Sequence, residues 1–164
     1  MALVMRDEMR SYMDVSPSDT TPTYELIGDG FTDATTSLNP NTYDRQYIHE
    51  RTGQSDVVSY APSMAYRADM DTEDPVLAFI WDVGNKRKIG SEATTTIVTV
   101  MMWEKGTATD TYKAYLQKIA IVPDNPGSGA AGTPLALSGN FKYKGDAVEG
   151  SWNESTKTFT PDEA

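Results

Sequence analysis

The chain has 164 residues and a formal net charge of −10 at pH 7, with 24 Asp and Glu against 14 Lys and Arg. A chain this acidic is poorly suited to gripping nucleic-acid phosphates, because that binding depends on Lys and Arg displacing counterions. Cysteine is absent, which excludes disulfides and thiolate metal sites. No apolar run approaches the roughly 20 residues that a membrane-spanning helix needs, so we expect no membrane contact.

The first residues lack a sustained hydrophobic period and include two X-Pro pairs. We interpret residues 1–22 as an extended N-terminal arm that becomes ordered on a neighbour, and residues 23–164 as a single β domain. Within that domain Tyr24–Ile27 is predicted to form a short strand. Residues 31–42 are predicted to be a turn-rich linker, since they include Asn-Pro-Asn.

Two strands are predicted next, over Tyr43–Arg51 and Asp56–Tyr66, with a turn between them at Gly53–Ser55. The second strand alternates Val, Tyr and Met with small residues, which indicates one packed face. Pro62 has no amide hydrogen to donate, so this strand is expected to lie at a sheet edge or to contain a bulge. An edge strand is available for pairing with another chain.

One α-helix is predicted over about residues 73–87. The segment Asp71–Pro75 supplies an N-cap, first-turn acids and an early proline. Apolar residues at helical spacing then follow, at Val76, Leu77, Ile80 and Val83. Lys86–Lys88 lies at the far end, where cations complement the helix dipole.

The second half of the chain is predicted to be β. Thr94–Glu104 is apolar on both faces and is expected to be a central strand, antiparallel to a strand over Thr109–Pro123. After a flexible loop over residues 124–134, alternation in Ser138–Phe159 indicates a closing meander that turns at Lys144–Asp146 and again at Asn153–Thr156. The predicted fold is mainly β, an antiparallel β-sandwich or open barrel with one flanking α-helix.

No motif indicates a catalytic, cofactor or metal site, so we expect a protein that is not an enzyme. His49 is interpreted as a structural or surface residue, since one His without Cys cannot build a His-rich metal site. The acids of Asp69–Asp74 fit helix capping better than a Ca²⁺ loop, because the Gly and distal Glu of that loop are missing. Gly127–Gly132 lacks the Lys-Ser/Thr and the helix of a phosphate-binding loop. A glycosidase-type carboxylate pair stays possible among the 24 acids, although no pair stands out.

Short blocks occur in order along most of the chain beyond residue 20. They are Leu26–Thr32 with Asn39–Pro40, Tyr47–Ile48, Val58–Ser63, Asp74–Val76 through Phe79–Ile80 to Arg87 and Gly90, Ala93–Thr95 with Ile97, Val98 and Val100, Thr133–Leu135 with Ser138–Gly139, and Gly145–Asp146 with Val148 and Gly150 before Phe159. In this order and spacing they resemble the tail tube (major tail) proteins of long-tailed phages and prophages of Gram-positive hosts.

The resemblance implies a β subunit that forms rings of six copies, which stack into a tube with an acidic lumen. Double-stranded DNA would pass through it without tight binding during ejection. Further partners would be tape measure and terminator proteins, and the location would be the virion tail, assembled in the host cytoplasm. The family implies no active site.

Two alternatives stay open: the inner tube of a contractile tail or tail-like particle, and a carbohydrate- or surface-binding β-sandwich. If the chain assembles, the candidate contacts are four segments of the predicted β fold. These are Met1–Pro22, Asp29–Thr42, Arg51–Asp56 and Asp124–Thr133.

Overall fold

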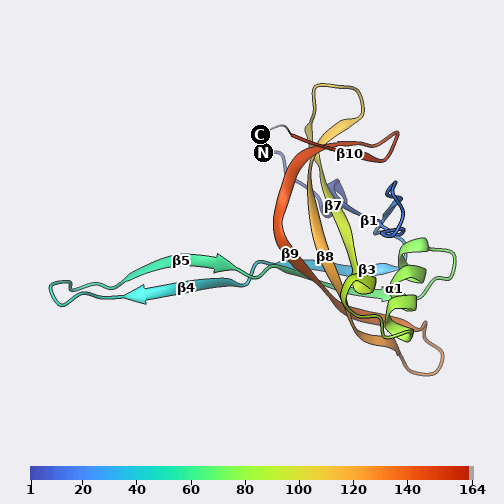
Figure 1. The fold of residues 1–164 in the computed structure, drawn as a ribbon, viewed down its shortest axis with the longest axis horizontal. Helices are drawn as coiled ribbons and strands as arrows, with labels where there is room; N and C mark the ends of the chain where they lie inside the picture. Colours follow the sequence, from blue (N-terminus) through green and yellow to red (C-terminus); the bar gives the residue numbers. More distant parts are fainter. Residues whose placement is uncertain (163–164) are drawn as a thin grey trace.

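The computed structural model describes residues 1–162, and 54% of the chain is in strands. Eight strands form one antiparallel sheet in the order β2-β1-β7-β8-β9-β6-β3, with β10 beside β9, while β4 and β5 form a separate two-stranded sheet. The large sheet curls into a half-barrel, α1 lies on one side of it, and the β4–β5 hairpin projects far from the body (Figure 1). The predicted fold class, mainly β with one flanking helix, is confirmed.

The elements have the following bounds. The strands are β1 (Met9–Asp14), β2 (Tyr24–Leu26), β3 (Phe31–Ser37), β4 (Pro40–Arg45), β5 (Gln54–Tyr60), β6 (Ser63–Asp69), β7 (Thr94–Lys105), β8 (Thr111–Ser128), β9 (Ala136–Asn153) and β10 (Thr158–Pro161). The helices are α1 (Pro75–Asn85) and two short 3-10 turns, η1 (Arg6–Glu8) and η2 (Gly90–Ala93).

The curled sheet has two cores, one on each face, because successive side chains of a strand point to opposite faces. Ile97 belongs to the helix-side core, which includes Leu77 and Ile80 of α1 and Phe141 of β9. Its neighbour Val98 belongs to the barrel-side core. The barrel-side core consists of Tyr12, Tyr24, Val98, Val100, Ala114 and Trp152. Strand β7 therefore serves both cores, as expected for a central strand that is covered on both faces.

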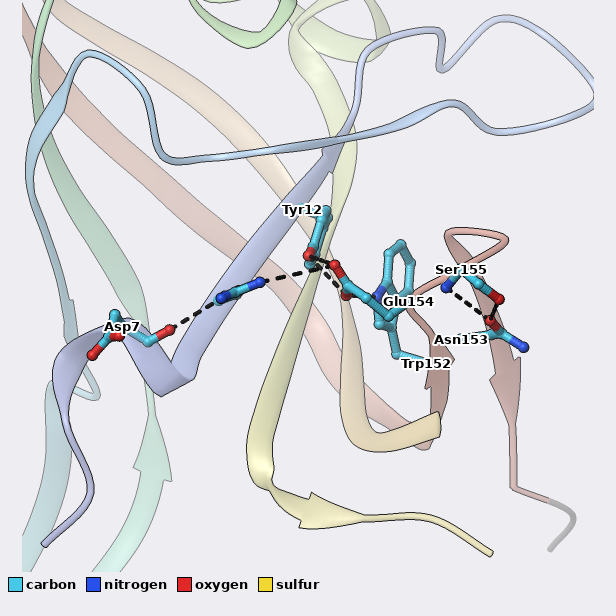
Figure 2. A network of polar contacts seen from close by, with 7 residues as sticks. Asp7, Tyr12, Trp152, Asn153, Glu154 and Ser155 are labelled. Carbon is cyan, nitrogen blue, oxygen red and sulfur yellow. Dashed lines mark hydrogen bonds and ion pairs between the residues drawn. The ribbon is translucent and has the colours of Figure 1, made fainter. Parts of the chain in front are cut away.

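Trp152 is the centre of the barrel-side core and is fully buried. The Tyr12 ring stacks on it with the centroids 4.5 Å apart, and the Tyr24 ring meets it edge-on at 5.5 Å. The Glu154 carboxylate accepts hydrogen bonds from Trp152 Nε1 at 2.9 Å and from Tyr12 Oη at 2.8 Å (Figure 2). Burial, together with the Glu154 carboxylate, raises the pKa of Tyr12 to about 12. This network ties β1 to the turn between β9 and β10.

Helix α1 spans Pro75–Asn85, two residues shorter at each end than predicted, with the predicted first-turn acids lying before it and Lys86–Lys88 after it. The Asp74 carboxylate accepts hydrogen bonds from the amides of Val76 at 2.9 Å and Leu77 at 3.4 Å, and Pro75 is the first helical residue. Such a cap satisfies amides that have no partner within the helix. The apolar face of Val76, Leu77, Ile80 and Val83 is buried in the helix-side core.

The prediction of a loose arm over residues 1–22 is wrong for the part that forms β1. Strand β1 lies between β2 and β7 in the sheet, and residues 11–14 are buried. Its pairing partners, Thr99 for Ser11 and Val98 for Tyr12, are far away in the sequence. The linker predicted over residues 31–42 is wrong as well, because β3 and the start of β4 occupy it. Strand β1 mixes its apolar residues with Arg, Ser and Asp, and β3 is mostly Thr, Ser and Asp, so neither has the apolar alternation that marks a strand in the sequence.

The strand predicted over residues 56–66 is broken at Ala61–Pro62 into β5 and β6, which belong to different sheets. The expectation of an irregularity at Pro62 is therefore met by a strand break. The strand predicted over residues 43–51 is displaced, since β4 ends at Arg45. Similarly, β8 continues to Ser128, so only part of the loop predicted over residues 124–134 is a loop.

The turn predicted at Lys144–Asp146 is a bulge inside one continuous strand, β9. Leu116 pairs with Val148, but Lys118 pairs with Lys144, so β9 has extra residues opposite Gln117. Gly145 has φ +74°, which glycine adopts without strain. The buried Gln117 amide donates hydrogen bonds to the carbonyls of Lys118, Lys144 and Gly145 at 3.0–3.2 Å and so satisfies the bulged backbone. The second predicted turn, at Asn153–Thr156, does separate β9 from β10.

Candidate assembly surfaces

The β4–β5 hairpin is the most exposed part of the described chain. Every residue of β5 and nearly all of β4 are exposed, including Tyr43, Val57, Val58 and Tyr60. Ile48 in the connecting turn is fully exposed. An isolated two-stranded hairpin is marginally stable in water, and a concentration of exposed apolar side chains is typical of a surface that another molecule covers.

Polar contacts between its strands hold the hairpin in one register. Arg45 forms an ion pair with Asp56, and its guanidinium lies 5.8 Å from the centre of the Tyr43 ring. Further along, Asn41 Nδ2 donates a hydrogen bond to Ser59 Oγ at 3.0 Å. These polar side chains are engaged within the hairpin, whereas Val57, Val58 and Ile48 stay exposed.

Strands β2 and β3 are the two ends of the main strand order, and they and β10 are each paired on one side only in the described structure. Strand β3, rich in Thr and Ser, pairs with β6 through residues 31–37. Its other side is met by Arg6, whose guanidinium donates a hydrogen bond to the Ala34 carbonyl at 3.3 Å. Free strand edges of this kind are templates for pairing with another chain.

The part of the sheet that packs against α1 has a second face that α1 does not cover, and this is called the open face (Figure 1). The cross-strand register places its members on β3, β6, β7, β8 and β9. They are Asp33, Thr35, Ser37, Ser63, Ala65, Arg67, Thr94, Thr96, Lys118, Ala120, Val122, Ser138, Asn140, Lys142 and Lys144, with Asp69 at the margin. Small polar residues and cations therefore predominate on this face.

The candidate contact segments predicted from the sequence fall on different elements. Residues 1–22 contain β1, and residues 29–42 contain β3 and the start of β4. Residues 51–56 belong to the hairpin, and residues 124–133 contain the end of β8 and the turn after it. The sequence thus indicated the hairpin in part, but its full length and the open face emerged only from the strand register.

The residues considered for chemistry lie apart from one another. The His49 side chain is 78% exposed in the hairpin turn, with Nε2 3.9 Å from Glu50 Oε1. The acids of Asp69–Asp74 include the helix cap described above, and Asp71 accepts a hydrogen bond from the Glu73 amide. Gly127 lies in β8 and is followed by a turn. No group of three or more His, Asp or Glu suited to a metal ion occurs within residues 1–162.

The basic run after α1 is engaged by one carboxylate. Lys86 Nζ and Lys88 Nζ lie 2.9 Å and 2.8 Å from the two oxygens of Asp82. Hydrogen bonds from Lys88 and from Lys86 lower the pKa of that carboxyl. The run thus pairs with an acid of the helix it follows. No helix in the described part of the chain has the length and apolarity to cross a membrane.

Sequence comparison found no matching family model and no matching curated protein. By structure, the chain is similar to a chain from the tail of an empty gene transfer agent (GTA) particle with C6 symmetry. The TM-score is 0.62 at 11% identity, over 96% of this chain and 99% of that one. It is also similar to a chain of the native GTA virion, with a TM-score of 0.60 at 11% identity over the same shares. The chain therefore shares the fold of these GTA particle chains.

Proposed function

We propose that this chain is the structural subunit of a tail tube. Copies form rings, six to a ring, and the rings stack into a tube. The observation that carries this proposal is the β4–β5 hairpin, since Tyr43, Val58 and Tyr60 are more than half exposed within the subunit and Ile48 is fully exposed. A second copy of the chain is the occupant that a repeating tube supplies for every hairpin.

Two further observations support assembly from identical copies. The open edges of β2 and β3 allow the half-barrel of one subunit to continue into that of the next. The fold is shared with a chain of the C6-symmetric GTA tail. The residues 1–162 are proposed to fold as one unit, because β1 joins the N-terminal part to the same sheet as the remaining strands.

The remaining parts of the proposal follow from the tube. Its location is the virion tail, assembled in the host cytoplasm, its partners include tape measure and terminator proteins, and its role is passage of double-stranded DNA without catalysis. The inner tube of a contractile tail would use the same subunit architecture. A glycan-binding module stays the less favoured alternative, because Trp152, Tyr12 and Tyr24 are buried in the barrel-side core, although Trp81 and Trp103 are 41% exposed.

The lining of the tube is where the proposal departs from the sequence-based hypothesis. We place the open face toward the lumen, because α1 covers the opposite face. Its cations are Arg67, Lys118, Lys142 and Lys144, against Asp33 and the marginal Asp69. The acidic lumen expected in the sequence analysis finds no support on this face.

Negative-stain microscopy of the purified protein tests the proposal, with matched variants in two exposed places. The wild type is expected to form tubes when concentrated in moderate salt. Ile48→Asp places a charge on the hairpin tip and is expected to abolish tubes while leaving the thermal melt of the subunit unchanged. Ile89→Asp is the control, since Ile89 is 81% exposed but lies between α1 and η2. A wild type that stays monomeric under all conditions, or tubes unaffected by Ile48→Asp, contradicts the proposal.

A further inference from the structure

We propose that the lysine cluster of the open face, Lys118, Lys142 and Lys144, binds the phosphate backbone of double-stranded DNA weakly and without sequence preference. The inference rests on the proposed function, in which this face lines the tube. It assigns the tube wall an attractive contact with its cargo. The contact is opposite in sign to what the net charge of the chain suggests.

The geometry of the cluster calls for an anion. Lys118 and Lys144 are directly opposite each other on β8 and β9, and Lys142 lies two residues along β9 on the same face. Like charges in opposite register destabilise a sheet, so this arrangement is costly unless an anion is bound between them. Within residues 1–162 no carboxylate forms an ion pair with any of the three. Lys144 Nζ has only a long hydrogen bond, 3.5 Å, to Thr94 Oγ1.

A hollow of about 910 Å³ adjoins the cluster and has room for a phosphate group. Lys118 and Lys144 line it together with the hydroxyls of Thr94 and Thr96. Its carboxylates are Glu92 and Asp14, and the latter already accepts hydrogen bonds from the amides of Ser16 and Thr23 at 2.9 Å and 3.1 Å. The hollow thus presents cations and hydroxyl donors side by side, as phosphate oxygens require.

The chemistry of the open face selects among anionic partners. Its members include no aromatic side chain, so single-stranded nucleic acid would lack the stacking platforms on which its binding depends. Trp and Tyr anchors, which carry much of protein–protein affinity, are absent from the open face, and its apolar members are Val122 and small Ala residues. Lysines act as flexible point charges, which suits a backbone and does not read bases. Duplex DNA is the partner that needs charge and nothing else.

The expected binding is weak and strongly dependent on salt. Three neutralised phosphates predict a slope of log K against log salt concentration of about −2.7. The net charge of −10 opposes binding from a distance, so contact forms only where the cluster meets the phosphates. A wall of this kind would hold duplex DNA loosely and release it as salt rises.

Fluorescence anisotropy with the full chain and a labelled DNA duplex, at salt between about 20 and 200 mM, tests the inference. The triple variant K118Q/K142Q/K144Q is expected to lose at least about tenfold in affinity at low salt and to lose most of the salt slope. The control is K105Q/K113Q/K157Q, which changes the net charge equally but lies outside the open face. This control variant is expected to keep the affinity at low salt within about twofold of the wild type and to keep the salt slope.

Four outcomes overturn the inference: no binding by the wild type at low salt, equal losses in both triple variants, tighter binding of a single strand of the same length, or tighter binding of polyglutamate than of the duplex. The last result would assign the cluster to an acidic protein segment. Microscopy of the same variants separates the two proposals. Tubes without DNA binding reject the lysine contact alone, whereas DNA binding without tubes rejects the assembly alone.

Discussion

The β4–β5 hairpin and the β8–β9 pair have the same local structure, two antiparallel strands, but opposite surroundings. In the β8–β9 pair, Phe141 and Ile121 lie under α1, and Trp152 is enclosed by the curl of the sheet. In the hairpin, Tyr43 and Val57 have comparable side chains but are more than half exposed. The difference shows that the same apolar strand pattern is covered within the subunit in β8–β9 and left exposed in the hairpin, where the proposed assembly would cover it.

The largest effect is expected from Trp152→Ala in the barrel-side core. It removes a fully buried ring and the stacking partner of Tyr12, so the free energy of unfolding is expected to fall by about 3–5 kcal/mol. Trp103→Ala is the control at a 41% exposed position and is expected to cost about 1 kcal/mol or less. Urea unfolding followed by circular dichroism measures both, and similar losses would show that the barrel-side core is not the main source of stability.

A smaller effect is expected from raising the pH. The folded chain holds the Tyr12 proton to a pKa of about 12, above the ordinary value of 10.0. Between these values the unfolded chain releases a proton that the folded chain keeps, so stability is complete below about pH 10 and falls as the pH rises towards 12. Urea unfolding at about pH 9 and about pH 11 should therefore show a smaller alkaline loss in Tyr12→Phe than in the wild type.

The exposed Tyr47→Phe is the control for that experiment and should behave as the wild type. An unchanged alkaline loss in Tyr12→Phe would assign the effect to the other buried tyrosines. The pKa of Tyr24, Tyr66 and Tyr143 is also raised, chiefly by burial.

The smallest effect is expected in the hairpin. Arg45→Ala removes the ion pair with Asp56, and exposed pairs contribute about 0.2–1 kcal/mol. Because the hairpin is a separate sheet, we expect the free energy of unfolding of the unassembled subunit to change by about 0.5 kcal/mol or less, as measured by urea unfolding. A loss above about 2 kcal/mol would make the hairpin part of the cooperative unit and would break the comparison.

Local sequence signals were sufficient for α1 and β7. Asp74, Pro75 and the spacing of Val76, Leu77, Ile80 and Val83 define a helix start and a buried face without reference to the rest of the chain. Strand β7 begins with a run of β-branched residues that favours a strand over a helix. In β7 propensity and burial agree, whereas in α1 the cap and the spacing of the buried residues define the helix despite its β-branched and aromatic residues.

Strands β1 and β3 were missed because their pairing is non-local. Met9–Asp14 mixes Arg, Ser and Asp with apolar residues, and only its pairing with β7 makes it a strand. Phe31–Ser37 is mostly Thr, Ser and Asp, as an edge strand permits. The bulge at Gly145 imitates a turn in the sequence, and what keeps β9 continuous there is the Gln117 amide from another strand.

The candidate surfaces were predictable to different degrees. The hairpin was partly visible as two Tyr- and Val-containing strands around a glycine turn. The lysine cluster was invisible, since Lys118 lies more than 20 residues from Lys142 and Lys144. Only the β8–β9 register, including the bulge, brings Lys118 opposite Lys144.

The change of covered side along β7 limits how the chain can vary in length. Odd-numbered Thr95 and Ile97 face α1, whereas even-numbered Val98 and Val100 face the interior of the curl. Deleting one residue between these groups would shift the register of one half of β7 by one residue. The apolar face of that half would then point to solvent and its polar face into a core. Insertions and deletions should therefore be tolerated at the far end of the hairpin, around residues 46–53, and be lethal to folding in the middle of β7.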